Sequence, residues 1–348
     1  MKNNVIYYSV GALLYCPANQ KNLADSVISE KFGTKYSLAL CLEDTINDNF
    51  VEEAERILNQ SLQKIYQQSQ LQAFYLPKIF VRVRNSLQIL RLTKAFGAAM
   101  EIVTGFIIPK FIPENALEYI SAIITANEQT NRPVYMMPIY EHSSIIDPRN
   151  RIDILYRLKD SLSAIEDCVL NIRVGGNDLC HSFGFRRHAD ETIHQIRPIA
   201  DIFSDIITVY GMDYVISGPV WEYYQGDQWD IGLKQELKED KLMGFTGKTV
   251  IHPNQISIVN DAYKVSQKDF DDAREILGWD QNASSLVSGS ASKERMNEYK
   301  THGSWQGKPY SLPRHLEFHR KKGTVCSFSP FLLRICQLLN NPAAFVMF

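Results

Sequence analysis

Two carboxylates, Glu141 and Asp178, each follow a short apolar run and could share a metal ion. Glu141 comes directly after "PVYMMPIY", and Asp178 lies in "VGGNDL", which continues from "CVLNIRV". Neighbouring strands of a sheet lie about 4.8 Å apart, so carboxylates at two adjacent strand ends can reach one hard dication. Mg2+ suits such a sparse pair because water and substrate oxygens complete its shell. The alternative is that Asp178 caps the helix that follows.

Two arginines, Arg82 and Arg84, lie in the apolar run "KIFVRVR". The period of two along a strand places both on one face, which would be the interior face if the strand belongs to a barrel. A buried cation needs an anion, and a flat guanidinium suits a carboxylate or a phosphate. We therefore expect a substrate anion near Arg82. The alternative is a structural ion pair with an acid such as Glu43.

Histidine and arginine side chains supply two weaker signals. His252 in "GKTVIHPNQ" follows an apolar run and could donate to a ligand oxygen, although a structural histidine is an equal alternative. The cluster "GFRRH" could contact phosphate or be solvated. The chain has no P-loop, GxGxxG or GxSxG motif, and Cys180 and His181 lack further ligands at zinc spacing.

The elements that must position these residues are short apolar runs separated by helical patterns. One helical stripe comprises Val51, Ala54, Leu58, Leu62 and Ile65. Apolar strands alternating with helices predict a parallel sheet, and eight such units predict a (β/α)8 TIM barrel, with a doubly wound open sheet as the alternative. A barrel builds its site at the carboxyl ends of its strands, where the polar residues fall. The eight runs span residues 9–16, 36–42, 78–84, 105–109, 133–140, 168–174, 213–218 and 249–253.

Composition favours a globular protein that binds small molecules. The 348 residues are 45% hydrophobic, and 37 basic residues nearly balance 39 acidic ones, so no charge excess indicates nucleic acid or a membrane surface as a partner. The six cysteines form no CxxC pair, which favours a reducing compartment. The N-terminal sequence lacks a secretory pattern, and no apolar stretch is long enough to span a bilayer. We expect a cytoplasmic enzyme or binding protein.

Six short motifs follow one another between about Tyr8 and Tyr263. They read "LLYCPANQKNL", "CLEDT", "FVRVRN", "GFIIPK", "GGNDL" and "GKTVIHPNQISIVNDAY". Any one of the motifs is weak, but six in order are specific. Together they resemble the HpcH/HpaI aldolase and citrate lyase β-subunit superfamily. The whole pattern is most similar to the divergent branch of TIM-barrel carbon–carbon bond lyases found beside tellurium-resistance and stress genes.

The resemblance implies roles for individual residues. Glu141 and Asp178 match its magnesium ligands, and Arg82 matches its substrate-binding arginine. Glu43 and Asp44 match the acidic pair that organises the waters around the metal, so together with Arg82 they form the expected catalytic group. We also expect substrate contacts from three further residues, which are Arg84, Lys110 and His252.

The implied activity is a Mg2+-dependent lyase or aldolase reaction on a 2-oxo or 2-hydroxy acid or its acyl-CoA thioester. Asn19 and Gln20 replace the family's acidic-basic pair in the first turn, so the use of coenzyme A is open. The alternative is a catalytically diverged barrel that acts as a ligand-binding or scaffolding component of a stress-response system. The resemblance also implies a homo-oligomer, either a trimer or a hexamer.

Two regions are expected along the chain. Residues 1–264 form the catalytic barrel, and residues 265–348 form a C-terminal helix that begins near Ser266, a polar lid-like loop and an atypical tail.

Overall fold

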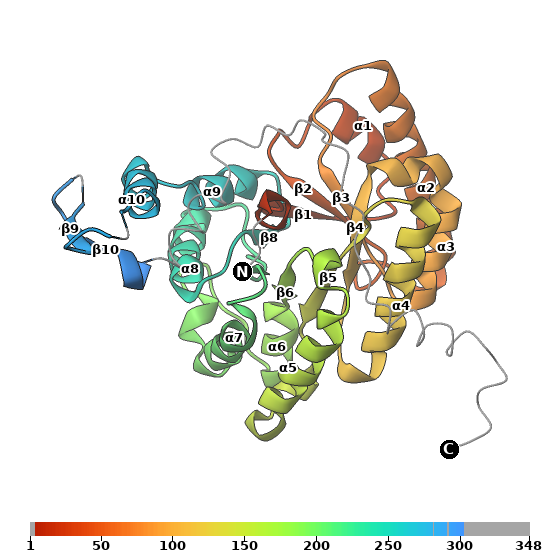
Figure 1. Ribbon diagram of the computed structural model, residues 1–348. Coiled ribbons are helices and arrows are strands. Elements are labelled where there is room, and N and C mark those ends of the chain that lie inside the picture. Colours follow the sequence, from red (N-terminus) through yellow and green to blue (C-terminus); the bar gives the residue numbers. More distant parts are fainter. Residues whose placement is uncertain (1–3, 281, 291, 303–348) are drawn as a thin grey trace.

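Eight parallel strands form the centre of the molecule (Figure 1). The computed structural model describes residues 4–280, 282–290 and 292–302. Strand neighbours follow the chain order from β1 to β7, and β8 returns to pair with β1. The strands are β1 (Ala12–Pro17), β2 (Ser37–Cys41), β3 (Lys78–Arg82), β4 (Val103–Ile108), β5 (Tyr135–Tyr140), β6 (Ile172–Val174), β7 (Ile216–Ser217) and β8 (Lys248–Val250).

The sheet closes into a barrel between β7 and β8. Gly218, directly after β7, forms a parallel bridge with Lys248, and its N–H donates to the carbonyl of Gly247 at 3.0 Å. Sequential strand order with closure confirms the predicted (β/α)8 barrel. The doubly wound alternative is wrong, because that fold requires a reversal of strand order in an open sheet.

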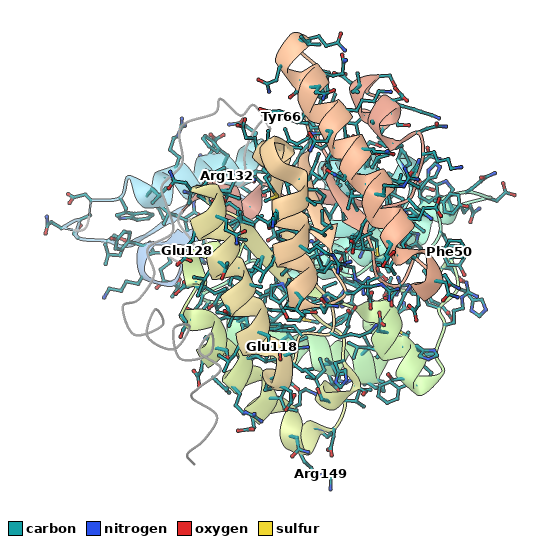
Figure 2. The ribbon with its side chains drawn as sticks, turned by 90° about the vertical axis from the view of Figure 1, so that its right-hand side faces the viewer. Phe50, Tyr66, Glu118, Glu128, Arg132 and Arg149 are labelled. Atoms are coloured by element: carbon teal, nitrogen blue, oxygen red, sulfur yellow. The ribbon has the colours of Figure 1, made fainter. Side chains whose placement is uncertain are left out.

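Helices surround the barrel, one after each strand and two after β6 (Figure 1). The predicted stripe on α2 is confirmed, since Ala54, Leu58, Leu62 and Ile65 are all buried. Charged side chains such as Glu118 point away from the barrel (Figure 2). The helices are α1 (Leu23–Ile28), α2 (Val51–Leu71), α3 (Ser86–Phe96), α4 (Pro113–Thr130), α5 (Pro148–Ser163), α6 (Gly176–Phe183), α7 (Arg197–Tyr210), α8 (Trp229–Met243) and α9 (Asn254–Ala262).

The interior of the barrel is a second, smaller core. Leu13, Phe80 and Met137 are among the inward side chains that form it. The 3-10 helix η1 (Val5–Tyr8) adds Tyr7 and Tyr8, and the Tyr7 hydroxyl donates to the carbonyl of Asp167, which precedes β6. The end of the barrel where the strands begin is thereby filled, so a ligand must enter at the carboxyl ends.

The segment after the barrel is more regular than the sequence predicted. Ser266 caps α10 (Gln267–Leu277) as expected, because its side chain accepts from the Asp269 N–H. Much of the predicted loop is instead an antiparallel hairpin of β9 (Val287–Gly289) and β10 (Met296–Glu298), outside the barrel (Figure 1). The atypical tail lies beyond the described residues. Within the described ranges, no helix has both the length and the apolarity needed to cross a membrane.

Lys248 forms a buried ion cluster between β8 and α8. Its side chain is 0% exposed, and Nζ lies 2.8 Å from Glu236 Oε1 and 2.6 Å from Asp240 Oδ2. His194 Nε2 also lies 2.7 Å from Asp240 Oδ1. Because both carboxylates are fully buried, they need a nearby cation, and Lys248 is the one that contacts both of them.

We predict that Lys248→Met destabilises the fold strongly, because it removes the cation that contacts two buried carboxylates and leaves Glu236 with only the longer contact to Arg187. The free energy of unfolding, measured by urea denaturation, should fall by about 3–5 kcal/mol. The matched control is Lys264→Met, which breaks the exposed pair with Asp261 and should change stability by at most about 1 kcal/mol. Similar small losses in both variants would contradict a structural role for the cluster.

Candidate active site

A cavity of about 310 Å³ opens at the carboxyl ends of the strands. This is the end that η1 leaves open, and it is where a barrel of this type places its chemistry. Side chains from the ends of five strands and from the loops after them form its wall. They are Tyr15, Asp44, Thr45, Arg82, Ile139, Glu141, Arg173, Val174, Gly175, Gly176, Asn177, Asp178, Val220, Thr249 and Ile251.

Arg82, the last residue of β3, carries the central positive charge. It is 8% exposed, and Nη2 lies 2.7 Å from Glu43 Oε2, 2.8 Å from Asp44 Oδ2 and 3.2 Å from Glu141 Oε1. The ion pair with Glu43 that the sequence left as an alternative is therefore present. Among the described residues, Arg82 Nε is buried without a hydrogen-bond partner, so the guanidinium still has an unpaired donor.

Glu141 lies directly after β5 and is 4% exposed. Its Oε1 accepts from the backbone N–H of Lys110 at 3.0 Å and from Arg82, whereas Oε2 forms no hydrogen bond within the described residues. Burial raises the pKa of Glu141 to about 8; Arg82 opposes this effect, and the negative charge of Asp178 adds to it. The two carboxylates therefore interact across the same cavity.

Gly175 leaves the space that the Glu141 side chain fills. A Cβ added at Gly175 would lie 2.3 Å from both Cβ and Oε2 of Glu141, which is too close for any real contact. The glycine between β6 and α6 thus lets the unbonded carboxylate oxygen sit against the backbone that leads to Asp178. This is a position at which only glycine fits, and the reason is close approach rather than backbone strain.

Asp178 lies in the first turn of α6, beside the same cavity. The N-cap position belongs to Gly175, and the helix start has no side-chain cap, so the capping alternative is wrong. Within the described part of the chain, the structure gives the Asp178 carboxylate no hydrogen bond or ion pair. Its oxygens are free to bind a ligand or metal.

This donor set fits Mg2+. Two carboxylates, Glu141 and Asp178, present unbonded oxygens to one cavity, and no cluster of three or more His, Cys, Asp or Glu side chains that could hold a metal occurs among the described residues. Mg2+ is the dication that accepts so few protein ligands, because it retains water and binds substrate oxygens. A second positive charge would also relieve the repulsion between the two carboxylates.

Glu43 and Asp44 follow β2 and hold Lys110 as well as Arg82. Lys110 Nζ lies 2.6 Å from Glu43 Oε1 and 3.2 Å from Asp44 Oδ1. Burial raises the pKa of Glu43. For Asp44, burial is outweighed by the hydrogen bond with Glu43 and by Arg82 and Lys110, so its pKa is lowered. Of these three residues only Asp44 reaches the cavity wall, and Lys110 contributes chiefly through its N–H to Glu141.

The structure does not bring Arg84 into the cavity. Its Nε donates to the carbonyl of Leu42 at 2.7 Å, Nη2 donates to that of Ile46 at 2.7 Å, and Nη1 pairs with Asp48 at 2.6 Å. The expectation that Arg84 faces the barrel interior with Arg82 is wrong, because β3 ends at Arg82 and the alternation of a strand stops there. Arg84 instead fixes the loop between β2 and α2.

His252 also lies outside the cavity wall. Its ring stacks on Tyr224 with centroids 4.7 Å apart, and Nδ1 accepts from the Asn254 N–H at 3.2 Å. These contacts agree with the structural histidine that the sequence left open.

Three residues of the cavity wall, Tyr15, Arg173 and Thr249, were not singled out from the sequence. Arg173 carries the strongest signal, because it is a cation inside the apolar run that ends before "GGNDL". Its position two residues before Gly175 places it on β6, where alternate side chains face the interior.

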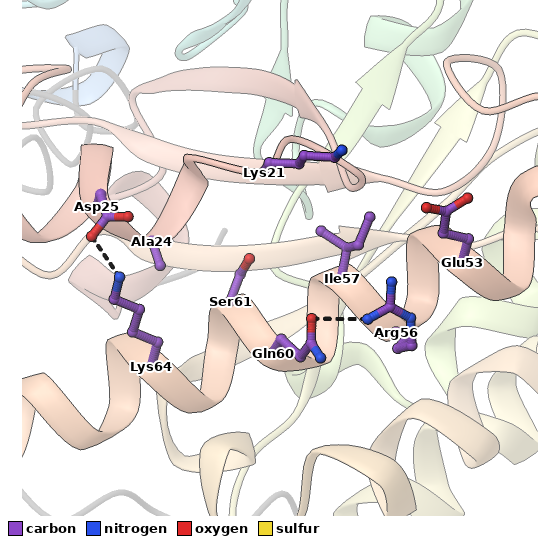
Figure 3. A pocket seen from close by; sticks show the side chains of 9 residues that line it. All are labelled: Lys21, Ala24, Asp25, Glu53, Arg56, Ile57, Gln60, Ser61 and Lys64. Atoms are coloured by element: carbon purple, nitrogen blue, oxygen red, sulfur yellow. Dashed lines mark hydrogen bonds and ion pairs between the residues drawn. The ribbon is translucent and has the colours of Figure 1, made fainter.

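A separate hollow of about 290 Å³ lies between α1 and α2, on the outside of the barrel (Figure 3). Its main charged contact is Lys64 with Asp25 at 2.6 Å, and both side chains are at least half exposed. Because it receives no residue from a strand end, we do not assign the chemistry to it.

Comparison with known proteins agrees with the barrel fold. Residues 4–312 match the model of the family described as C–C bond lyase of the TIM-barrel fold. A stretch of 46 residues is 44% identical to mitochondrial citramalyl-CoA lyase of Homo sapiens, and this match covers 13% of the chain and only 14% of the relative.

Two solved structures of CitE from Mycobacterium tuberculosis share the fold. The complex with magnesium, acetoacetate and coenzyme A has a TM-score of 0.58 at 16% identity, covering 88% of this chain and 99% of that chain. The complex with magnesium and pyruvate has a TM-score of 0.51 at 18% identity, covering 75% and 93%. Identity at this level shows the fold alone, whereas the family model spans most of the sequence. The chain belongs to the C–C bond lyase family of the TIM-barrel fold.

Proposed function

We propose that this protein is a Mg2+-dependent lyase that cleaves or forms a carbon–carbon bond in a 2-oxo or 2-hydroxy acid or its acyl-CoA thioester. The observation that carries the proposal is the pair of unbonded carboxylates, Glu141 and Asp178, on the same cavity wall as Arg82. A carboxylate and an adjacent oxygen on one carbon skeleton can bind a dication and a guanidinium together.

The residues that line the cavity divide between metal binding, substrate binding and the orientation of water. Glu141 Oε2 and the Asp178 carboxylate would hold the metal, which when bound supplies Lewis-acid stabilisation of the negative oxygen that develops as the bond breaks. Arg82 would bind the substrate carboxylate. The carboxylates around Arg82 outweigh its burial and raise its pKa, so it stays charged. Asp44 reaches the cavity and is the group best placed to orient water.

The size of the cavity bears on the substrate. At about 310 Å³ it lies at the low end for ligand pockets, which are roughly 300–1,000 Å³. This space suits the reacting acid, and a coenzyme A moiety would have to extend outside it. The complex of M. tuberculosis CitE with magnesium, acetoacetate and coenzyme A is a precedent for coenzyme A and a short acid on this fold.

The alternative of a diverged binding or scaffolding barrel has less support. A scaffold has no need for two unbonded carboxylates and a buried guanidinium at the mouth of the barrel, because such an arrangement costs stability unless a ligand compensates it.

The proposal also includes a homo-oligomer, either a trimer or a hexamer. Sedimentation velocity measures this oligomeric state.

The metal site predicts a calorimetric result. Titration with Mg2+ should show one site in the native chain, and Glu141→Gln and Asp178→Asn should each weaken it by about 10- to 100-fold or more, because each removes a direct charged ligand. Glu118→Gln, an exposed change on α4, is the control and should bind like the native chain. Equal affinities in all four proteins would refute the site.

Gly175→Ala tests the same site without removing any ligand. The new methyl group should displace the Glu141 carboxylate, so Mg2+ affinity should fall by about 10-fold. Gly289→Ala, where no heavy atom lies within 4 Å of an added Cβ, is the matched control and should leave the affinity unchanged. Native affinity in Gly175→Ala would show that Glu141 does not bind the metal from this position.

Turnover tests the reaction itself. Citrate, malate and citramalate and their CoA thioesters, assayed with Mg2+, should include one that releases pyruvate, glyoxylate, oxaloacetate or acetyl-CoA. Arg82→Lys should then reduce kcat/KM by about 10- to 100-fold, because the forked charge-assisted hydrogen bonds are lost. A variant as active as the native enzyme would remove Arg82 from substrate binding, and no turnover of any compound would favour the binding-protein alternative.

A further inference from the structure

We infer that Arg173 is a specificity-determining residue that binds a second carboxylate of the substrate, one not held by the metal. This inference rests on the proposed function, in which Glu141, Asp178 and Arg82 would hold one end of the acid. Arg173 would bind the carboxylate at the opposite end. It predicts that the preferred acid is dicarboxylic.

The fold places Arg173 inside the barrel, just below the site. On β6 it is level with Ile139 of β5 and Ser217 of β7, and Ile139 belongs to the interior core. Glu141 lies directly after β5, two residues beyond Ile139, and both residues line the same cavity as Arg173. Arg173 is therefore one layer deeper than the proposed metal ligands and lines the same cavity.

The guanidinium of Arg173 has neutral partners only. Nη2 donates to the Thr249 hydroxyl at 2.5 Å, and Tyr15, which lines the same cavity, is a second neutral neighbour. Nη1 is buried and has no hydrogen-bond partner among the described residues, and the whole residue is only 2% exposed. Buried donors are almost always satisfied in proteins, so an unpaired N–H group on a residue that lines the cavity indicates a missing acceptor.

Arg173 differs in this respect from the other buried cations in the described residues. Arg82 and Lys248 each contact two or more carboxylates. Arg151 pairs with Asp205 at 2.7 Å, and Arg187 lies 3.6 Å from Glu236. Arg173 forms no ion pair with any described side chain. A buried charge without a counter-ion is costly, and a ligand anion would offset that cost.

Tyr15 connects the two halves of the cavity. Burial raises its pKa to about 12, the charges of Arg82 and Arg173 oppose this, and Glu141 adds to it. The phenol thus lies within electrostatic range of both arginines and of the Glu141 carboxylate, and all four residues line the cavity. All of these residues line one cavity of about 310 Å³. A short acid in this cavity that contacts Arg82 at one end can therefore reach Arg173 at the other.

A carboxylate is the anion that the geometry favours. The planar guanidinium fork matches its two oxygens, and one such contact to a charged group is worth a substantial share of binding. A phosphate would be held by a more open, multiply charged site, whereas here a single cation lies among neutral hydroxyls of Tyr15 and Thr249.

The test uses two acids that differ only at the far end, malate and 2-hydroxybutyrate, in which a methyl group replaces the second carboxylate. Calorimetry on the full chain with saturating Mg2+ should give malate about 10- to 100-fold tighter binding in the native protein. Arg173→Met should remove this preference and leave 2-hydroxybutyrate affinity within about twofold, and Arg173→Lys should restore part of it. Arg151→Met, a buried arginine outside the cavity wall, is the control and should keep the preference.

Several results separate this inference from the proposed function. If both acids bind and malate keeps its advantage in Arg173→Met, the inference is wrong while the proposed function stands. The inference is also wrong if the native protein binds malate no more tightly than 2-hydroxybutyrate. This comparison does not depend on the folding of any variant. If neither acid binds the Mg2+-loaded native protein, the inference is wrong, and the turnover screen decides separately whether the proposed function stands.

Discussion

The guanidinium of Arg82 is the charge on which the rest of the site depends, because a cation inside a barrel is tolerated only where anions surround it. Three carboxylates converge on it from different elements: Glu43 and Asp44 after β2, and Glu141 after β5. The demand for counter-charge at one point thus fixes the positions of two loops. Lys110 completes the arrangement by pairing with the first two acids and donating its N–H to the third.

That arrangement leaves an excess of negative charge on one side. Oε1 of Glu141 is committed to Arg82 and Lys110, so Oε2 is the oxygen that faces Gly175 and the start of α6. Asp178 adds a second carboxylate there, and the two repel each other. A dication resolves this conflict, and its preference for few protein ligands matches what the cavity offers.

The sequence predicted the architecture well because buried parallel strands are short apolar runs that need no distant information to recognise. It also predicted that Arg82, Glu141 and Asp178 share one cavity, since each follows or ends such a run. The prediction for Arg84 was wrong because it extended the strand alternation two residues beyond the true end of β3 at Arg82. The hairpin of β9 and β10 was missed because its segment is polar and lacks an apolar alternation. The absence of a counter-ion for Arg173 is a property of the folded barrel, which no local pattern encodes.

The central claim is that Glu141 and Asp178 hold one dication together. Anomalous diffraction from crystals soaked in Mn2+, an ion that takes the same oxygen ligands, tests it most directly. The account predicts a single strong peak about 2.1–2.2 Å from Glu141 Oε2 and from an Asp178 carboxylate oxygen. A peak that contacts neither residue, or no peak in this cavity at saturating Mn2+, would contradict it.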